Sequence, residues 1–176
     1  MERGTSVRRD DAGDDAGDDA GVVVSVNVSD GGVPKYPVAD AWVAASGVDG
    51  DRQRNLEYHG GPDRAVCIFA AEVIERLWGD GHPIAPGTTG ENLTVRGLPW
   101  PRVVPGAQLR VGATTLLQIT AYAAPCRTIA ASFNDRRSGR ISQKRHPGAS
   151  RVYARVLVPG RVAPGDAVRL LEPAEP

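Results

Sequence analysis

Short runs of β-branched residues, separated by glycine and proline, dominate this sequence of 176 residues. The chain contains 21 glycines and 14 prolines, and nearly every gap between apolar runs holds one of them. Glycine and proline favour turns and interrupt regular secondary structure. Many short strands with turns between them are typical of a sandwich or a barrel, so the pattern predicts a mainly β fold.

Strands and helices can be assigned to particular runs. Strands are predicted at residues 22–28, 65–69, 92–96, 108–111, 114–120, 151–158 and 167–171. A helix is predicted over 70–78, because Val73, Ile74 and Leu77 fall on one face at helical spacing. A second short helix is predicted over 127–133. Both helices are expected to pack against the barrel from outside.

Acidic residues are concentrated in the first 21 residues, which hold seven acids, three arginines and an Asp-Asp-Ala-Gly repeat. Such a segment buries too little apolar surface to offset the entropy of ordering, so we expect residues 1–21 to be a disordered tail. A single domain is predicted at 22–172, followed by a short tail at 173–176. Because the whole chain is neutral, residues 22–176 carry a net charge of +4. That charge is too small to indicate a nucleic-acid-binding protein.

The two cysteines give an expectation about the compartment. They lie 59 positions apart and match neither a disulfide framework nor a Cys-x-x-Cys pair. The sequence shows no signal peptide, and no apolar run approaches the roughly 18 residues of a membrane-spanning helix. We therefore expect a cytoplasmic protein with reduced thiols and no membrane partner.

The first candidate site is the turn that contains Gly60 and Gly61, flanked by His59, Asp63 and Arg64. Two glycines let the backbone approach a ligand closely, and successive N–H groups in such a turn can cradle an anion. An ordinary Gly-Pro turn with a surface histidine explains the same residues equally well.

The second candidate site is the loop 86–93, which contains Gly90, Glu91 and Asn92. Its donors and tight turns suit an oxyanion or a polar heterocycle. A glycine-rich loop before a strand is, however, more often only a loop.

The third candidate is Cys126, which follows a predicted strand and precedes a predicted helix. The amides at the start of the helix and the charge of Arg127 would favour the thiolate, which attacks electrophiles and binds soft metals. Cys67, by contrast, is predicted to be a buried, inert thiol in mid-strand. The arginine-rich stretch 135–151 fits either a basic lid over an anionic ligand or a solvated loop.

Taken together and in order, these segments resemble the MOSC domain family, named after the C-terminal domain of molybdenum-cofactor sulfurases. The similar segments are residues 25–28, 50–53, 59–66, the helix with Trp78, 86–93, Pro125-Cys126, 155–157 and 164–166. The resemblance covers about residues 22–172 and is greatest to the stand-alone bacterial branch associated with detoxifying N-hydroxylated bases. In this chain, Arg151-Val152 replaces the Gly-Trp pair of some relatives.

The resemblance implies a β-barrel of mixed strands with a few short peripheral helices. It also implies that Cys126 binds the molybdenum of a pterin cofactor (molybdopterin) or carries sulfur. The residues implied to bind the cofactor are Arg52, His59, Gly60, Gly61, Arg64, Gly90, Glu91, Asn92 and Arg127. The arginines among them would neutralise its phosphate.

Three functions follow from this resemblance. The first is reduction of N-hydroxylated compounds, with Cys126 as metal ligand, His59 and Asp63 as proton-relay candidates, a small-molecule substrate and an external electron-donor protein. The second is sulfur transfer or cofactor handling through a Cys126 persulfide. The third is a ligand-binding domain without catalysis.

Overall fold

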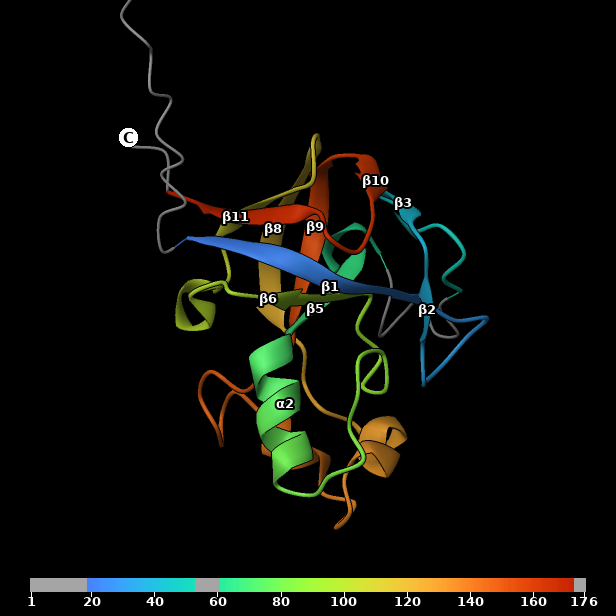
Figure 1. Cartoon of the computed structure of the whole chain (residues 1–176), viewed down its shortest axis with the longest axis vertical. Helices are drawn as coiled ribbons and strands as arrows, with labels where there is room; N and C mark the ends of the chain where they lie inside the picture. Colours follow the sequence, from blue (N-terminus) through green and yellow to red (C-terminus); the bar gives the residue numbers. More distant parts are fainter. Residues whose placement is uncertain (1–18, 53–60, 173–176) are drawn as a thin grey trace, which may run out of the picture.

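Seven strands close into a barrel in the computed structural model, which describes residues 19–52 and 61–172 (Figure 1). Around the barrel the strands follow the order β11, β7, β8, β9, β5, β6 and β1, and β1 pairs with β11 to complete the ring. Their bounds are β1 Ala20–Val28, β5 Val66–Ala70, β6 Leu93–Arg96, β7 Gln108–Val111, β8 Thr115–Tyr122, β9 Val152–Val158 and β11 Ala167–Leu171.

The barrel is mixed, because β5 and β6 are parallel while the other neighbours in the ring are antiparallel. The helix α2 (Ala71–Gly79) lies between β5 and β6 in the chain. It returns the chain to the same end of the barrel, as a parallel connection requires.

Four short strands add to the barrel. The strand β2 (Tyr36–Val38) extends the sheet beside β1, and β3 (Ala41–Ala44), β4 (Gly47–Val48) and β10 (Gly160–Val162) form a small separate sheet. Four 3₁₀ helices are described as well: η1 Pro62–Arg64, η2 Trp100–Arg102, η3 Arg127–Ser132 and η4 Ser138–Ile141.

Two apolar clusters lie on opposite sides of the barrel wall. Val66 and Ile68 of β5 belong to the cluster inside the barrel, whereas Phe69 belongs to a second cluster with Ile74 of α2 and Phe133. Successive side chains of a strand point to opposite faces, so β5 contributes to both clusters. The helix and the loops that follow Cys126 thus cover one outer face of the barrel (Figure 1).

The structure confirms the mainly β fold and each of the seven predicted strands, with shifts at their ends. The first strand begins at Ala20, two residues before the predicted start. The short helix predicted at 127–133 is present as a 3₁₀ helix, Arg127–Ser132. The predicted disorder of the tail concerns residues that lie almost wholly outside the described ranges. Among the described residues, no helix has the length and apolar character needed to cross a bilayer.

Candidate functional site

One row of paired residues across five strands positions the candidate site. Val26 of β1, Leu93 of β6, Ile68 of β5, Val152 of β9 and Tyr122 of β8 are successive partners in this row. Their side chains pack in or against the core of the barrel. The residues next to them in sequence, such as Asn92, Cys67 and Tyr153, therefore face the opposite side of the wall.

A cavity of about 570 Å³ opens on that side of the wall. Segments far apart in the sequence form it: the turn after β1, the loop before β6, the segment after β8 and the start of β9. The residues that line it are Gly31, Gly32, Val33, Lys35, Arg52, Arg64, Cys67, Thr89, Gly90, Asn92, Ala124, Cys126, Thr128, Ile129, Arg151 and Tyr153.

Cys126 is half-buried at the wall of this cavity, immediately before η3. Its Sγ lies 2.6 Å from the Thr128 hydroxyl oxygen. Burial acts to raise the pKa of the Cys126 thiol. Hydrogen bonds from the hydroxyl and N–H of Thr128, the charge of Arg151 and the N–H of Ile129 outweigh burial and hold the pKa below its ordinary value. The hydrogen bonds of Thr128 thus contribute most to lowering the pKa, and the charge that contributes is that of Arg151; the predicted Arg127 is exposed and outside the cavity lining.

Cys67 lines the same cavity, but the pKa of its thiol is shifted in the opposite direction to that of Cys126. Its side chain is 5% exposed, and burial raises the pKa of its thiol. Its N–H donates to the Asn92 side-chain oxygen at 3.1 Å, which fixes the amide of Asn92 beside β5. The cavity therefore contains one thiol whose pKa is lowered and one whose pKa is raised.

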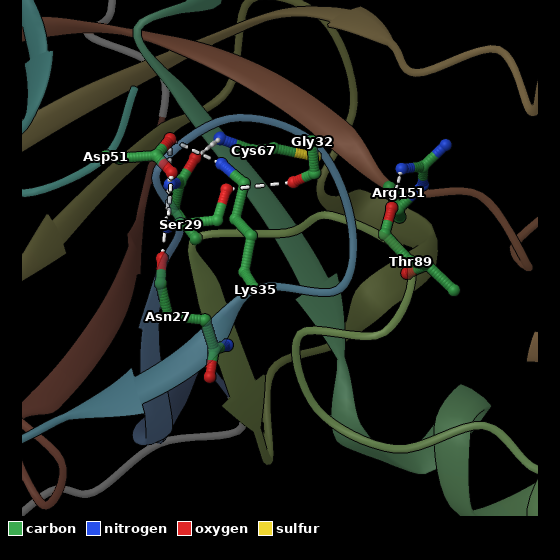
Figure 2. A network of polar contacts seen from close by, with 9 residues as sticks. Asn27, Ser29, Gly32, Lys35, Asp51, Cys67, Thr89 and Arg151 are labelled. Atoms are coloured by element: carbon green, nitrogen blue, oxygen red, sulfur yellow. Dashed lines mark hydrogen bonds and ion pairs between the residues drawn. The ribbon is translucent and has the colours of Figure 1, made fainter. Parts of the chain in front are cut away.

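A buried polar network braces the loops on one side of the cavity (Figure 2). Asp51 accepts hydrogen bonds from Lys35 Nζ at 2.5 Å, from Asn92 Nδ2 at 2.9 Å and from the Ser29 N–H at 3.0 Å. The Asp51 side chain is buried and the Lys35 side chain is 11% exposed, and their opposite charges are held in contact. This network fixes Asn92 and Lys35 against the cavity.

Arg151 lies directly before β9 and is 5% exposed. Its Nη1 donates to the Thr89 backbone carbonyl (Figure 2). Its Nε has no hydrogen-bond partner among the described residues. A guanidinium held in this way presents a fixed positive charge to the cavity.

Tyr153 lies two residues farther along, on the same face of β9. Its pKa is raised to about 12, first by burial and then by the neighbouring thiols of Cys67 and Cys126. The Arg64 guanidinium carbon lies 5.6 Å from the centre of the Tyr153 ring. At neutral pH the Tyr153 hydroxyl therefore keeps its proton at the cavity.

The structure brings together five of the predicted site residues at the cavity lining: Cys126, Arg52, Arg64, Gly90 and Asn92. His59 and Gly60 lie outside the described residues. Gly61, Asp63, Glu91 and Arg127 are not among the lining residues. Asp63 is exposed and forms an ion pair with Arg155, at 2.9 Å between carboxylate oxygen and guanidinium nitrogen.

Glu91 is fully buried behind the cavity. Its carboxylate accepts hydrogen bonds from the Gly87 N–H and the Thr89 hydroxyl, both at 2.7 Å, and from the Thr94 hydroxyl at 3.2 Å. These contacts hold the loop that carries Gly90 and Asn92. The side chain of Glu91 therefore shapes the wall of the cavity and does not face its interior.

The sequence did not single out Lys35, Cys67 and Tyr153 as site residues, and it offered Arg151 only as part of the arginine-rich stretch 135–151. For two of them a local signal exists, because alternation along the strand 151–158 places Arg151 and Tyr153 on one face. Lys35 and Cys67 offer no comparable signal. They reach the cavity through the pairing of β1, β5 and β6, which is non-local.

The sequence of this chain is similar to those of known proteins. A family model described as the MOSC domain matches residues 55–169, which is more than half of the chain. The chain is 33% identical over 147 residues to "Uncharacterized protein YflK" of Bacillus subtilis (strain 168), covering 82% of this chain and 65% of that protein. It is 31% identical over 123 residues to "Protein YiiM" of Escherichia coli (strain K12), covering 66% of this chain and 53% of that protein.

A solved structure is similar to this chain as well. The crystal structure of YiiM from Geobacillus stearothermophilus superposes with a TM-score of 0.62 and 27% identity, covering 86% of this chain and 75% of that one. This chain spans only part of the two curated relatives, 65% of the length of YflK and 53% of the length of the Escherichia coli YiiM.

Proposed function

This chain belongs to the MOSC domain family, and from that premise we propose that its cavity binds the molybdenum of a pterin cofactor through Cys126 and reduces N-hydroxylated compounds. Hydroxylamines and N-hydroxylated bases are the substrate class. The observation that carries the proposal is the half-buried Cys126 thiol, whose pKa is lowered, at the wall of a cavity of about 570 Å³.

The residues present fit such a cofactor. A thiolate is a suitable ligand for a soft metal. The cavity volume lies within the roughly 300–1,000 Å³ usual for sites that bind small organic molecules. Lys35, Arg52, Arg64 and Arg151 line it and suit the phosphate of a pterin cofactor.

The chain's own residues have defined tasks in this proposal. The bound cofactor supplies the two-electron redox chemistry. Cys126 would hold it, and the contact with the Thr128 hydroxyl orients the sulfur and helps to lower the pKa of the thiol. Tyr153, protonated at neutral pH, is a proton donor at the cavity wall. His59 and Asp63 stay predictions as proton relays; Asp63 is outside the cavity lining and forms an ion pair with Arg155.

The overall reaction defines the partners. A hydroxylamine takes up two electrons and two protons, the N–O bond breaks, and an amine and water are released. The sequence has no flavin, haem or iron–sulfur motif, so the electrons come from an external donor protein. The compartment in this proposal is the cytoplasm, where thiols stay reduced.

Elemental analysis for molybdenum tests the proposal, on protein purified from a host that makes the cofactor. We expect near-stoichiometric metal in the wild type and in Arg110→Gln, a matched control on the exposed face of β7. Cys126→Ala should lose the metal and the turnover of hydroxylamines. Equal metal content in Cys126→Ala and the wild type would refute a ligand role for Cys126.

Mass spectrometry on the same samples separates the alternatives. A sulfur adduct on Cys126 without molybdenum would favour a persulfide carrier. If the protein contains no molybdenum and the Cys126 thiol is unreactive, a ligand-binding domain without catalysis is favoured.

A further inference from the structure

Arg151 is a buried cation that forms no ion pair with a carboxylate in the described part of the chain. A guanidinium has five N–H donors. Here Nη1 donates to the Thr89 carbonyl, and Nε is buried without a partner among the described residues. Nε is enclosed by protein atoms, but Arg151 lines the cavity and no described carboxylate neutralises its charge, so an anionic ligand there would gain electrostatic binding free energy.

The other cations of the cavity are already engaged. Lys35 is held by Asp51 at 2.5 Å, Arg52 lies 3.3 Å from an oxygen of Asp30, and Arg64 stacks over the ring of Tyr153. No described aspartate or glutamate lines the cavity. The described wall is therefore positively charged, and Arg151 has donors left for an anion.

The position of Arg151 relates such an anion to the reactive thiol. The Ala123 N–H donates to the Arg151 carbonyl at 2.9 Å, so the start of β9 is tied to the segment that leads to Cys126. The charge of Arg151 also acts on the Cys126 thiol. An anion bound to Arg151 thus lies in the part of the cavity that contains Cys126.

We propose that Arg151 selects the ligand of this cavity by binding its carboxylate or phosphate group. The inference rests on the proposed function only in taking this cavity as the ligand site. It adds the chemical class of the ligand, a compound that carries an oxyanion, and it names Arg151 as the residue that determines this specificity.

Alkylation of Cys126 by two small reagents tests the proposal on the full chain without cofactor. Iodoacetate carries a carboxylate and iodoacetamide is neutral, and both attack the thiolate. The ratio of their rates is therefore independent of the pKa of Cys126, which the variants also change. We expect this ratio, followed on the Cys126 peptide by mass spectrometry, to fall about tenfold in Arg151→Gln. Arg151→Lys, which keeps the charge, should retain most of the preference.

The matched control is Arg110→Gln, which removes one positive charge at an exposed position of β7 outside the cavity lining. Its rate ratio should equal that of the wild type. An unchanged ratio in Arg151→Gln would overturn the proposal. An equal fall in Arg110→Gln would overturn it as well, because net charge alone would then explain the preference.

Two further arms distinguish the sources of the oxyanion. If Arg151→Gln loses molybdenum and pterin to the same extent as Cys126→Ala, the anion is the phosphate of the cofactor. If loading is kept but the preference for a carboxylated over an uncharged N-hydroxylated compound falls about tenfold, the anion belongs to the substrate. Retention of both would overturn the assignment to either ligand. A wild type without molybdenum would refute the proposed function, while the alkylation ratio would still decide the role of Arg151.

Discussion

Two buried carboxylates, Asp51 and Glu91, hold the loops that form the cavity. Asp51 ties Lys35 and Asn92 together, and Glu91 closes the loop before β6 through three hydrogen bonds. Both side chains are surrounded by donors, as buried carboxylates require. The positions of the cavity residues therefore depend on the carboxylates of Asp51 and Glu91, which lie behind the cavity wall.

Replacing Asp51 with alanine should be strongly destabilising. The change leaves the ammonium of Lys35 buried without its counter-charge and removes the acceptor of Asn92. Breaking a buried ion pair from one side costs about 3–5 kcal/mol in the free energy of unfolding. Urea denaturation followed by circular dichroism measures this free energy.

The matched control for Asp51→Ala is Asp40→Ala, which breaks an ion pair with Arg161 between exposed side chains. Exposed pairs contribute about 0–1 kcal/mol, so this variant should unfold almost as the wild type does. Equal losses in the two variants would contradict the structural role given to Asp51.

Cys126 offers a prediction about pH. Alkylation by iodoacetamide proceeds through the thiolate, so its rate rises with pH and levels off above the pKa. Because the pKa of Cys126 is lowered, the rate should level off at a lower pH than for an ordinary cysteine. Thr128→Val removes the hydroxyl donor and should move the midpoint to higher pH.

Thr114→Val, at an exposed position between β7 and β8, is the control for Thr128→Val and should leave the midpoint unchanged. A midpoint that stays in place in Thr128→Val would show that the hydroxyl does not stabilise the thiolate.

Among the elements, the helix α2 shows how an amphipathic segment covers the barrel. Val73, Ile74 and Leu77 are buried against the outer face of the wall, while Trp78, near the C-terminal end of the helix, is 69% exposed. The helical spacing of these residues is visible in the sequence, and the structure confirms the helix with a shift of one residue at each end.

Ile74→Ala should therefore destabilise the protein by about 2–5 kcal/mol, because it leaves a cavity in the outer cluster. Trp78→Ala, a larger truncation on the same helix, should change the free energy of unfolding by less than about 0.5 kcal/mol. Thermal and urea unfolding of both variants check this pair. A greater loss in Trp78→Ala would contradict the orientation of α2.

The segment after Cys126 shows the limit of local patterns. The spacing of Ile129, Ala130 and Phe133 predicted a short helix without its type, and the chain forms a 3₁₀ helix that ends at Ser132. The side chains of Ile129 and Phe133 enter the outer cluster. Burial in that cluster thus determines which residues face inward. A 3₁₀ helix has fewer residues per turn than an α-helix and still buries both side chains.

For the whole molecule, closure of the barrel depends on β1, which pairs with β6 along one edge and with β11 at its start. The first residues of β1, Ala20 to Val22, are partners of Arg169, Val168 and Ala167 in β11. The carbonyl of Asp19 accepts a hydrogen bond from the Leu170 N–H at 2.8 Å. The ring is therefore completed by residues that lie within or next to the predicted acidic tail.

A chain that begins at Asp19 should be as stable as the full chain, because residues 1–18 have the composition of a disordered segment. A chain that begins at Val24 loses the pairing with β11 and the buried side chain of Val23. We expect a loss on the order of 3 kcal/mol or more. Urea denaturation of the three chains measures the difference, and equal stability of all three would contradict closure through β1.

The fold was largely predictable from the sequence, and the site only in part. Seven strands were predicted, including β6 and β7 with four residues each, whereas β2, β3, β4 and β10, with two to four residues each, were not. Cys126 was singled out from its local setting, and it lines the cavity; its reactivity stays a prediction. Asp63 and Glu91 stand in motifs that suggested the site, but their carboxylates are engaged elsewhere in the structure.

By itself the sequence determined the order of strands and turns, the face of α2 that is buried, and the cysteine that follows a strand and precedes a helical turn. These features depend on near neighbours in the chain, through turn propensity and the periodicity of apolar residues. Only the tertiary structure decided that Lys35, Cys67, Arg151 and Tyr153 share one cavity with Cys126. Their meeting depends on the pairing of β5 with β9 and of β1 with β6, because strand register between distant segments is fixed by the packing of the whole barrel.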